Sequence, residues 1–381
     1  MRQTRRAVLA AAATVFLAGT AMSWAADGPI TVGATVPTTG PLSLTGKQYF
    51  NTLTMAEEDI NKAGGINGRQ LKIVIEDAGA SNSTAVSAFV KLIQETRPPF
   101  AFLTSYSTQN LAVAPEVAKA GIPVMYSGGA DAVSENGNSW MFRIRPADSL
   151  AGRAMAQFAT GTLKAAKPGI LYIQNDFGQG GAAVAQKQLE AAGLKVVASE
   201  AYGQNDKDFS AQLLRLRSSG ADVVFIFCYP ADGALVLRQA KALGLKMPIV
   251  ASSAAFVPAA LQLLSATDLD NVWGVVDAFV DPSVGGRMKD FAERYKAKFG
   301  TDADPYGLAY YDGALLMAEG MSKAGTDPKA LRDWLAAAKD WPGIGHPYTF
   351  DAKGNGVHDL AIVKAKRGTK SLELVQSVKL D

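Results

Sequence analysis

Short runs rich in Val and Ile alternate with longer segments of helical periodicity from Ile30 to about Ser253, and this alternation restricts the possible folds more than any other feature. Continuous apolar runs suit strands that are buried on both faces, and the amphipathic segments between them suit crossover helices. The order therefore predicts an α/β fold built on parallel sheets. The expected strands are 30–36, 71–76, 100–104, 123–127, 141–145, 169–174, 194–200, 221–229, 248–252 and 272–279.

The pattern completes one unit near Ser127 and restarts after Arg145, so we expect two doubly wound α/β lobes of similar layout. The length of 381 residues points the same way, because a single hydrophobic core rarely supports so long a chain. After the last of these strands, the sequence predicts helices over 287–299, 307–324 and 329–339, followed by short strands over 348–350, 359–366 and 372–378.

Residues 1–26 have the features of an export signal: three arginines, an uncharged apolar stretch and a final run of small residues. The apolar stretch is shorter than the roughly 20 residues that a stable membrane anchor needs. We therefore expect export from the cytoplasm and cleavage near Ala25 or Ala26. The pair Arg5-Arg6 leaves both the general and the twin-arginine export routes open.

Charge and composition exclude several classes of function. The chain has 38 Lys and Arg against 35 Asp and Glu, and three of the arginines lie in the signal, so no excess of positive charge suits nucleic acid. The single cysteine, Cys228, forms no internal disulfide and is expected to lie buried on a strand. His346 and His358 are the only histidines, and neither an H-E-x-x-H nor a G-x-S-x-G motif occurs. We therefore expect neither an enzyme nor a metal site, and no cofactor.

Several segments, read together, resemble one family, the branched-chain amino acid type of periplasmic solute-binding protein that serves ATP-driven (ABC) importers. The resemblance covers nearly the whole mature chain. The matching segments are Thr38-Thr39-Gly40-Pro41-Leu42, Glu58-Asp59-Ile60-Asn61-Lys62-Ala63-Gly64-Gly65-Ile66-Asn67-Gly68-Arg69, Gly121-Ile122-Pro123-Val124, Phe142-Arg143-Ile144-Arg145-Pro146, Asp176-Phe177-Gly178-Gln179-Gly180 and Leu237-Arg238-Gln239-Ala240.

This resemblance implies the type I periplasmic binding protein fold, in which three crossing strands form a hinge between the lobes. The first lobe would comprise 27–146 plus 277–341, and the second 147–276 plus 342–381. A small-molecule ligand would bind in the cleft and favour closure, because only the closed state lets both lobes contact it. The resemblance also implies a periplasmic monomer that delivers its ligand to the membrane permease subunits of an ABC importer.

The loops that follow strands are the expected ligand contacts, because helix N-termini point their free amides there. Ser105 and Tyr106 follow one strand and lead into a helix, and by resemblance Ser105 occupies the family's carboxylate-binding serine position. Hydroxyls and amides at a helix N-terminus suit a carboxylate. The alternative is that the neighbouring Ser107 only caps the helix. Thr39 and Gly129, in two other loops after strands, are further candidates.

Two positions depart from the amino acid binders of the family. Asp131 stands where they have a threonine, and an ionised aspartate there would repel a ligand carboxylate. Ser253 stands where they have the glutamate that pairs with the ligand's ammonium group. The alternative for Asp131 is that it caps the next turn and faces water.

Aromatic residues complete the expected site. By resemblance Phe177, Tyr229 and Tyr306 line the cleft, and Tyr106 lies close to the same loops; such walls suit flat or apolar ligands. These residues predict a small carboxylate without an α-amino group, with an aromatic acid as the first choice. The alternatives are a branched-chain or other amino acid, or an amide or urea that donates hydrogen bonds to Asp131.

Two other classes of protein compete with this interpretation. Gly178-Gln179-Gly180-Gly181-Ala182-Ala183 satisfies a dinucleotide-binding pattern after a strand, with Glu200 at a suitable distance. Export from the compartment that holds nicotinamide cofactors argues against it. A sensor or receptor ectodomain would share the fold, and a soluble signalling partner remains open.

Overall fold

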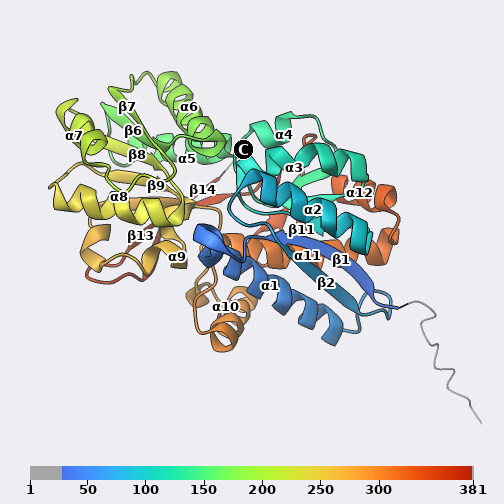
Figure 1. The fold of residues 1–381 in the computed structure, drawn as a ribbon. Coiled ribbons are helices and arrows are strands. Elements are labelled where there is room, and N and C mark those ends of the chain that lie inside the picture. Colours follow the sequence, from blue (N-terminus) through green and yellow to red (C-terminus); the bar gives the residue numbers. More distant parts are fainter. Residues whose placement is uncertain (1–27, 380–381) are drawn as a thin grey trace, which may run out of the picture.

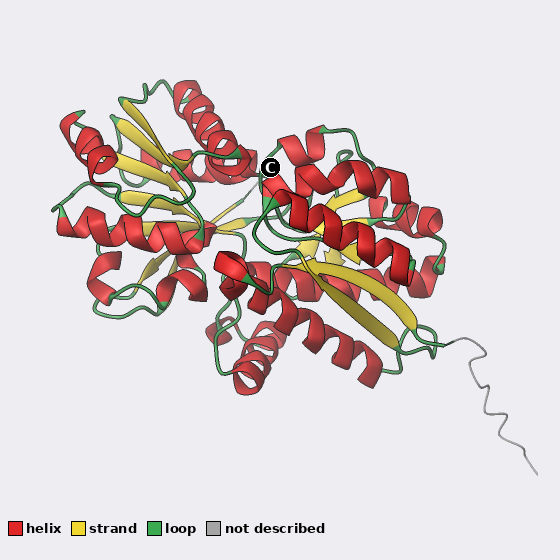
Figure 2. Ribbon diagram, in the orientation of Figure 1, coloured by secondary structure: helices red, strands yellow, loops and turns green. Residues whose placement is uncertain are grey.

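Two β-sheets, each flanked by helices, organise the computed structural model, which describes residues 28–379 (Figures 1 and 2). The expected export signal, 1–26, and its cleavage site lie outside the described residues. No helix of residues 28–379 combines the length and the apolarity that crossing a bilayer requires. The two lobes meet along a gap that the chain crosses several times.

The sheet of the first lobe has the order β2-β1-β3-β4-β5, and all its strands are parallel, as predicted. Val32 and Ala34 on β1 are completely buried, because helices cover both faces. The elements in chain order are β1 Ile30–Val36, α1 Ser43–Lys62, β2 Leu71–Asp77, α2 Asn82–Thr96, β3 Ala101–Phe102, α3 Ser107–Ala120, β4 Val124–Tyr126, α4 Ala132–Glu135 and β5 Met141–Arg143.

The sheet of the second lobe has the order β14-β13-β10-β9-β8-β6-β7; β13 and β14 run antiparallel at one edge and the other strands are parallel. Cys228 lies buried just after β8, next to Gly233 of the following helix. The elements are α5 Asp148–Gly161, β6 Pro168–Ile173, α6 Asp176–Ala191, β7 Ala198–Tyr202, α7 Ser210–Ser218, β8 Val223–Phe227, α8 Pro230–Ala242, β9 Ile249–Ser252, α9 Pro258–Leu261, β10 Val272–Val276, β13 Leu360–Ala365 and β14 Leu372–Val378.

The chain returns to the first lobe after β10. Helix α11 packs along α1, and Tyr310 and Leu316 lie buried in the core between them. The remaining elements are α10 Gly286–Phe299, α11 Pro305–Ala324, α12 Pro328–Ala336, β11 Trp341–Pro342 and β12 Pro347–Tyr348, with 3-10 turns at Gly40–Leu42, Ser253–Phe256, Ala266–Leu269 and Pro282–Val284.

The packing of the short β11–β12 ribbon differs from the expected lobe boundary. We expected 342–381 in the second lobe, whereas Tyr348 and Phe350 pack in the core of the first lobe. The ribbon stays there because β12 pairs with β11 rather than with the second sheet. We therefore propose that the second lobe regains the chain only after Gly356, shortly before β13.

Candidate ligand-binding cleft

Three aromatic rings from both lobes meet in the gap between the sheets. Tyr106 precedes α3 in the first lobe, whereas Phe177 lies on α6 and Tyr229 precedes α8 in the second. Tyr106 and Tyr229 form an edge-to-face pair with ring centroids 5.0 Å apart, and Phe177 stacks on Tyr229 at 5.3 Å. Each ring follows the carboxyl end of a parallel strand. The chain therefore brings three of the expected site residues together, with Tyr229 of the second lobe in contact with both Phe177 and Tyr106, the latter from the first lobe.

Ser105 lies beside this aromatic group, between β3 and α3. Its hydroxyl forms a hydrogen bond with the Tyr49 hydroxyl of α1, and the Tyr49 ring packs 4.7 Å from Tyr310 of α11. The Ser107 hydroxyl accepts a hydrogen bond from the Ala130 N–H at 3.1 Å and so links two loops instead of capping its own helix. Ser105 is thus held by a tyrosine that the sequence did not identify.

Asp131 and Gly129 serve the junction between the lobes. Both oxygens of Asp131 accept hydrogen bonds from Ser149, one from its N–H at 3.0 Å and one from its hydroxyl at 2.5 Å. The Gly129 carbonyl accepts from the Asp148 N–H at 2.8 Å, and a Cβ on Gly129 would lie 2.1 Å from a carboxylate oxygen of Asp148. Asp131 therefore holds the first turn of α5, and Gly129 must remain a glycine for α5 to approach.

A buried ion cluster links two of the crossing segments. Arg145 precedes α5 and contacts Asp277, which follows β10, through Nε at 2.9 Å and Nη2 at 3.0 Å. Its Nη1 lies 3.6 Å from Asp148, and its guanidinium lies 5.5 Å from the centre of the Tyr306 ring. Burial raises the pKa of Asp148 to about 6, against the lowering effect of Arg145. The predicted site residue Tyr306 thus lies beside the ion cluster that links the crossing segments.

The last two predicted residues have different surroundings. Ser253 is buried in the 3-10 turn that follows β9 in the second lobe. Thr39 is exposed, and its hydroxyl donates to Asp77 at 2.5 Å, so its side chain is engaged within the first lobe. Thr39 is therefore not among the residues that the structure brings together around the three rings.

Asp304, which the sequence did not single out, is the most unusual charged residue of this region. It caps α11 by accepting the Gly307 N–H at 2.6 Å, and only 1% of its surface is exposed. Its second oxygen, Oδ2, is buried and has no hydrogen-bond partner among residues 28–379. Burial raises its pKa to about 7, and the negative charge of Asp277 adds to the rise, whereas the N–H groups of Gly307 and Tyr306 oppose it. In the sequence, Asp304-Pro305 is a common pattern for the start of a helix, so it did not indicate that Asp304 would be a buried carboxylate with an unpaired oxygen.

Replacing Asp304 with Asn is expected to change how stability depends on pH. Because the folded protein holds the Asp304 proton up to about pH 7 and the unfolded chain loses it near 3.8, the free energy of unfolding falls as pH rises between these values. Between pH 5 and pH 8 the free energy of unfolding should therefore decrease by about 2 kcal/mol less in the variant than in the wild type. Denaturant titrations at both pH values check it. A fall equal to that of the wild type would contradict the assignment, since Asp148 and Asp312 supply only the remainder.

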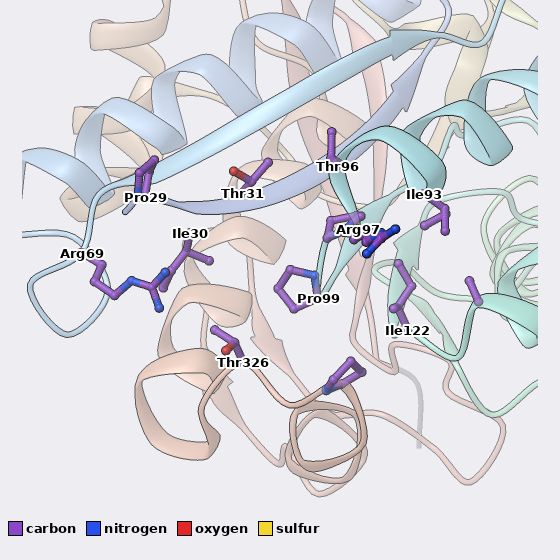
Figure 3. A pocket seen from close by; sticks show the side chains of 13 residues that line it. Pro29, Ile30, Thr31, Arg69, Ile93, Thr96, Arg97, Pro99, Ile122 and Thr326 are labelled. Carbon is purple, nitrogen blue, oxygen red and sulfur yellow. The ribbon is translucent and has the colours of Figure 1, made fainter. Parts of the chain in front are cut away.

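Two cavities lie outside this group of residues. One, of about 600 Å³, opens at the amino ends of the first sheet's strands and is lined by Ile30, Arg69, Arg97 and Pro99, among others (Figure 3). Another, of about 520 Å³, lies between the lobes near Phe256 and Lys296. Neither is lined by any predicted site residue. Within residues 28–379 no three His, Cys, Asp or Glu side chains gather in a way that could hold a metal ion.

Comparisons with known proteins agree with this architecture. A family model described as "Periplasmic binding protein" matches residues 29–370. An amino acid binding protein of Pseudomonas aeruginosa is 30% identical over 311 residues, which cover 80% of this chain and 82% of that protein.

Two solved structures share the fold. The substrate-binding protein LivJ of a Streptococcus pneumoniae branched-chain amino acid transporter, in complex with isoleucine, has a TM-score of 0.82 at 23% identity and covers 92% of this chain and 99% of that one. A solute-binding protein of an ABC transporter from R. palustris, in complex with benzoate, has a TM-score of 0.80 at 20% identity, with 92% and 97% covered.

Proposed function

The chain belongs to the periplasmic binding protein family, and from this premise we propose that its ligand is a small α-amino acid with an apolar side chain, held between the two lobes. As a member of this family the protein is an extracytoplasmic solute-binding component of an ABC transporter and not an enzyme. Its further partners in this proposal are the permease subunits of the importer, which it meets as a monomer.

The observation that carries the proposal is the closure of Tyr106 on Tyr229 and Phe177 next to the Ser105 hydroxyl. An apolar side chain packed against these rings would remove its surface from water, while the ligand carboxylate would meet a hydroxyl at the start of α3. The N-terminus of that helix adds unpaired amides and a positive potential. The loop thus offers a polar end and an aromatic end to one ligand.

The surroundings of Asp131 favour an amino acid over an aromatic acid. One of the two arguments against an amino acid was that Asp131 would repel the ligand carboxylate, and both oxygens of Asp131 instead accept hydrogen bonds from Ser149 of α5. The other argument, Ser253 in place of a glutamate, is not affected by this contact. The named relative that is 30% identical binds amino acids. An aromatic acid is the second candidate, because the parallel rings of Phe177 and Tyr229 suit a flat ligand.

Closure supplies the transport signal in this mechanism. The lobes are joined by three crossing segments, and a ligand that contacts Ser105 on one lobe and Tyr229 on the other lowers the free energy of the closed state. The permease then distinguishes loaded from empty protein by the distance between the lobes. No bond is made or broken in this cycle.

Titration calorimetry with leucine, isoleucine and benzoate tests the choice of ligand. We expect heat from at least one of the amino acids and a weaker response to benzoate. Tight binding of benzoate with no response to any apolar amino acid would overturn the proposal in favour of the aromatic acid. Catalytic turnover of any of these compounds would overturn it altogether.

Replacing Ser105 with Ala should weaken binding of the preferred amino acid by about 1 to 3 kcal/mol, because a charged carboxylate loses one hydrogen-bond donor. The measurement is the dissociation constant by calorimetry, with thermal unfolding as a check on the fold. Thr39→Ala is the matched control, since the Thr39 hydroxyl is engaged by Asp77, and its affinity should stay within about threefold of the wild type. Equal affinity of Ser105→Ala and wild type would remove Ser105 from the site.

A further inference from the structure

The second carboxylate oxygen of Asp304 lacks a hydrogen-bond partner within residues 28–379 although it is buried, and burying an unpaired polar atom is energetically unfavourable. Asp304 is almost completely buried, and while one oxygen caps α11, Oδ2 makes no hydrogen bond within residues 28–379. Proteins rarely bury an unpaired charged atom without a functional reason. The helix cap explains one oxygen only, so the other calls for a group that the chain itself does not supply.

The position of this oxygen connects it to the cleft. The segment before α11 contacts α1 directly, because the Gln48 side-chain amide donates a hydrogen bond to the Asp302 carbonyl at 3.2 Å, and Tyr49, the next residue, packs 4.7 Å from Tyr310 of α11. In agreement with this placement, burial raises the pKa of Tyr49, Tyr106 and Tyr310, and the negative charge of Asp304 adds to the rise in all three. Tyr49 in turn holds Ser105.

Among the described residues, Asp304 lacks the cationic partner that the other buried carboxylates of this region have. Asp148, Asp277 and Asp304 are all buried. Arg145 contacts the first two, and the buried Arg143 also lowers the pKa of Asp148. The imbalance of charge is therefore confined to Asp304. No ion pair joins Asp304 to a Lys, Arg or His in the described part of the chain, and the nearby charge of Asp277 is negative. A cationic group that enters the cleft would correct the imbalance, whereas an anion alone would increase it.

We propose that Asp304 binds the ammonium group of the ligand, with Tyr49, Tyr106 and Tyr310 around it, and that this contact selects amino acids over carboxylic acids without an amino group. The inference rests on the proposed function, because it assumes a ligand carboxylate at Ser105. By the resemblance described above, Ser253 stands where amino acid binders have the glutamate that pairs with the ammonium, and in this proposal Asp304 takes over that role. The acidic partner thus moves from the second lobe to the first.

This arrangement places both charged ends of the ligand on the same lobe. Ser105 and Asp304 belong to the first lobe, so an amino acid would bind there before closure, and the second lobe would then add Phe177 and Tyr229. The order of events is therefore capture by the first lobe and closure by the second.

The test compares leucine with 4-methylpentanoate, which is leucine without its amino group, by calorimetry on the wild type and on Asp304→Asn. Asn preserves the cap acceptor and removes the charge. We expect the variant to lose about 10- to 100-fold in affinity for leucine and to change by less than about threefold for 4-methylpentanoate. Asp327→Asn is the matched control, because Asp327 caps α12 in the same way, through the Ala330 N–H, at an exposed position.

The outcomes separate this inference from the proposed function. Suppose that leucine or isoleucine binds the wild type. If Asp304→Asn then leaves the affinity for that amino acid unchanged, or weakens the binding of leucine and of 4-methylpentanoate equally, the inference is overturned and the proposed function stands. If no apolar amino acid binds the wild type, both fail. Asp304→Ser, a second uncharged cap, gives the same comparison should the Asn variant fold poorly.

Leucine affinity of the wild type should also rise with pH through about 7, as Asp304 ionises, and this rise should be absent in either variant.

Discussion

Replacing Arg145 with Met should lower the free energy of unfolding by about 3 to 5 kcal/mol, the cost of leaving buried charges without their partner. Arg145 joins Asp277 at 2.9 Å and lies 3.6 Å from Asp148, and all three side chains are at least 94% removed from solvent. Met fills a similar volume, so the loss reports charge rather than space. Urea titration followed by circular dichroism measures the change.

The matched control is Lys241→Met at the exposed pair between Lys241 and Asp270, whose N–O distance is also 2.9 Å. Because water screens this pair, the control should change stability by less than about 1 kcal/mol. A decrease in the free energy of unfolding of less than about 1 kcal/mol in Arg145→Met would mean that Asp148 and Asp277 become protonated or hydrated with little loss of stability. The junction between the lobes would then depend on packing rather than on charge.

Replacing Gly178 with Ala should destabilise the protein by about 3 kcal/mol, at the upper end of the range for overpacked sites. A Cβ at this position would lie 1.9 Å from the backbone oxygen of Ile173, which cannot move without displacing β6. The glycine is needed so that α6 can start directly against its own strand. Thermal and denaturant unfolding measure the effect.

Gly180→Ala, two residues further along α6, is the control. There a Cβ would find its nearest neighbour at 3.9 Å, so the variant should be neutral or more stable by up to about 1 kcal/mol through helix propensity. The contrast between these two positions would attribute the glycine pattern to packing between helix and strand. Equal tolerance at both would contradict the packing explanation for Gly178.

Most of the fold could be predicted from the sequence because the apolar runs are short, buried and regularly spaced. Strands 30–36 and 372–378 have the predicted bounds, whereas the strand expected at 194–200 is observed at Ala198–Tyr202. Three of the four residues after Gly193 are apolar, yet Val197 is 39% exposed and lies in the loop. Hydrophobicity alone could not distinguish an exposed connection from the strand that follows it.

From the sequence, site residues could be predicted only where they directly follow a strand. Ser105, Tyr106 and Tyr229 follow strands, so parallel-sheet geometry brings them to one edge. Tyr49 lies on α1 and Asp304 begins α11, and only the packing of α11 along α1 places them together. The engagement of Asp131 by Ser149 likewise depends on how the chain crosses between lobes. No local pattern encodes such contacts.

The second sheet has a consequence for biosynthesis. Strand β10 exposes an open edge until β13 pairs with it, and β13 and β14 come much later in the chain than the rest of this sheet. The ribosome must therefore translate as far as Val378 before this lobe can complete its sheet, and a polypeptide truncated before Leu360 would have a bare strand open to aggregation. Chaperones and proteases would meet that species first.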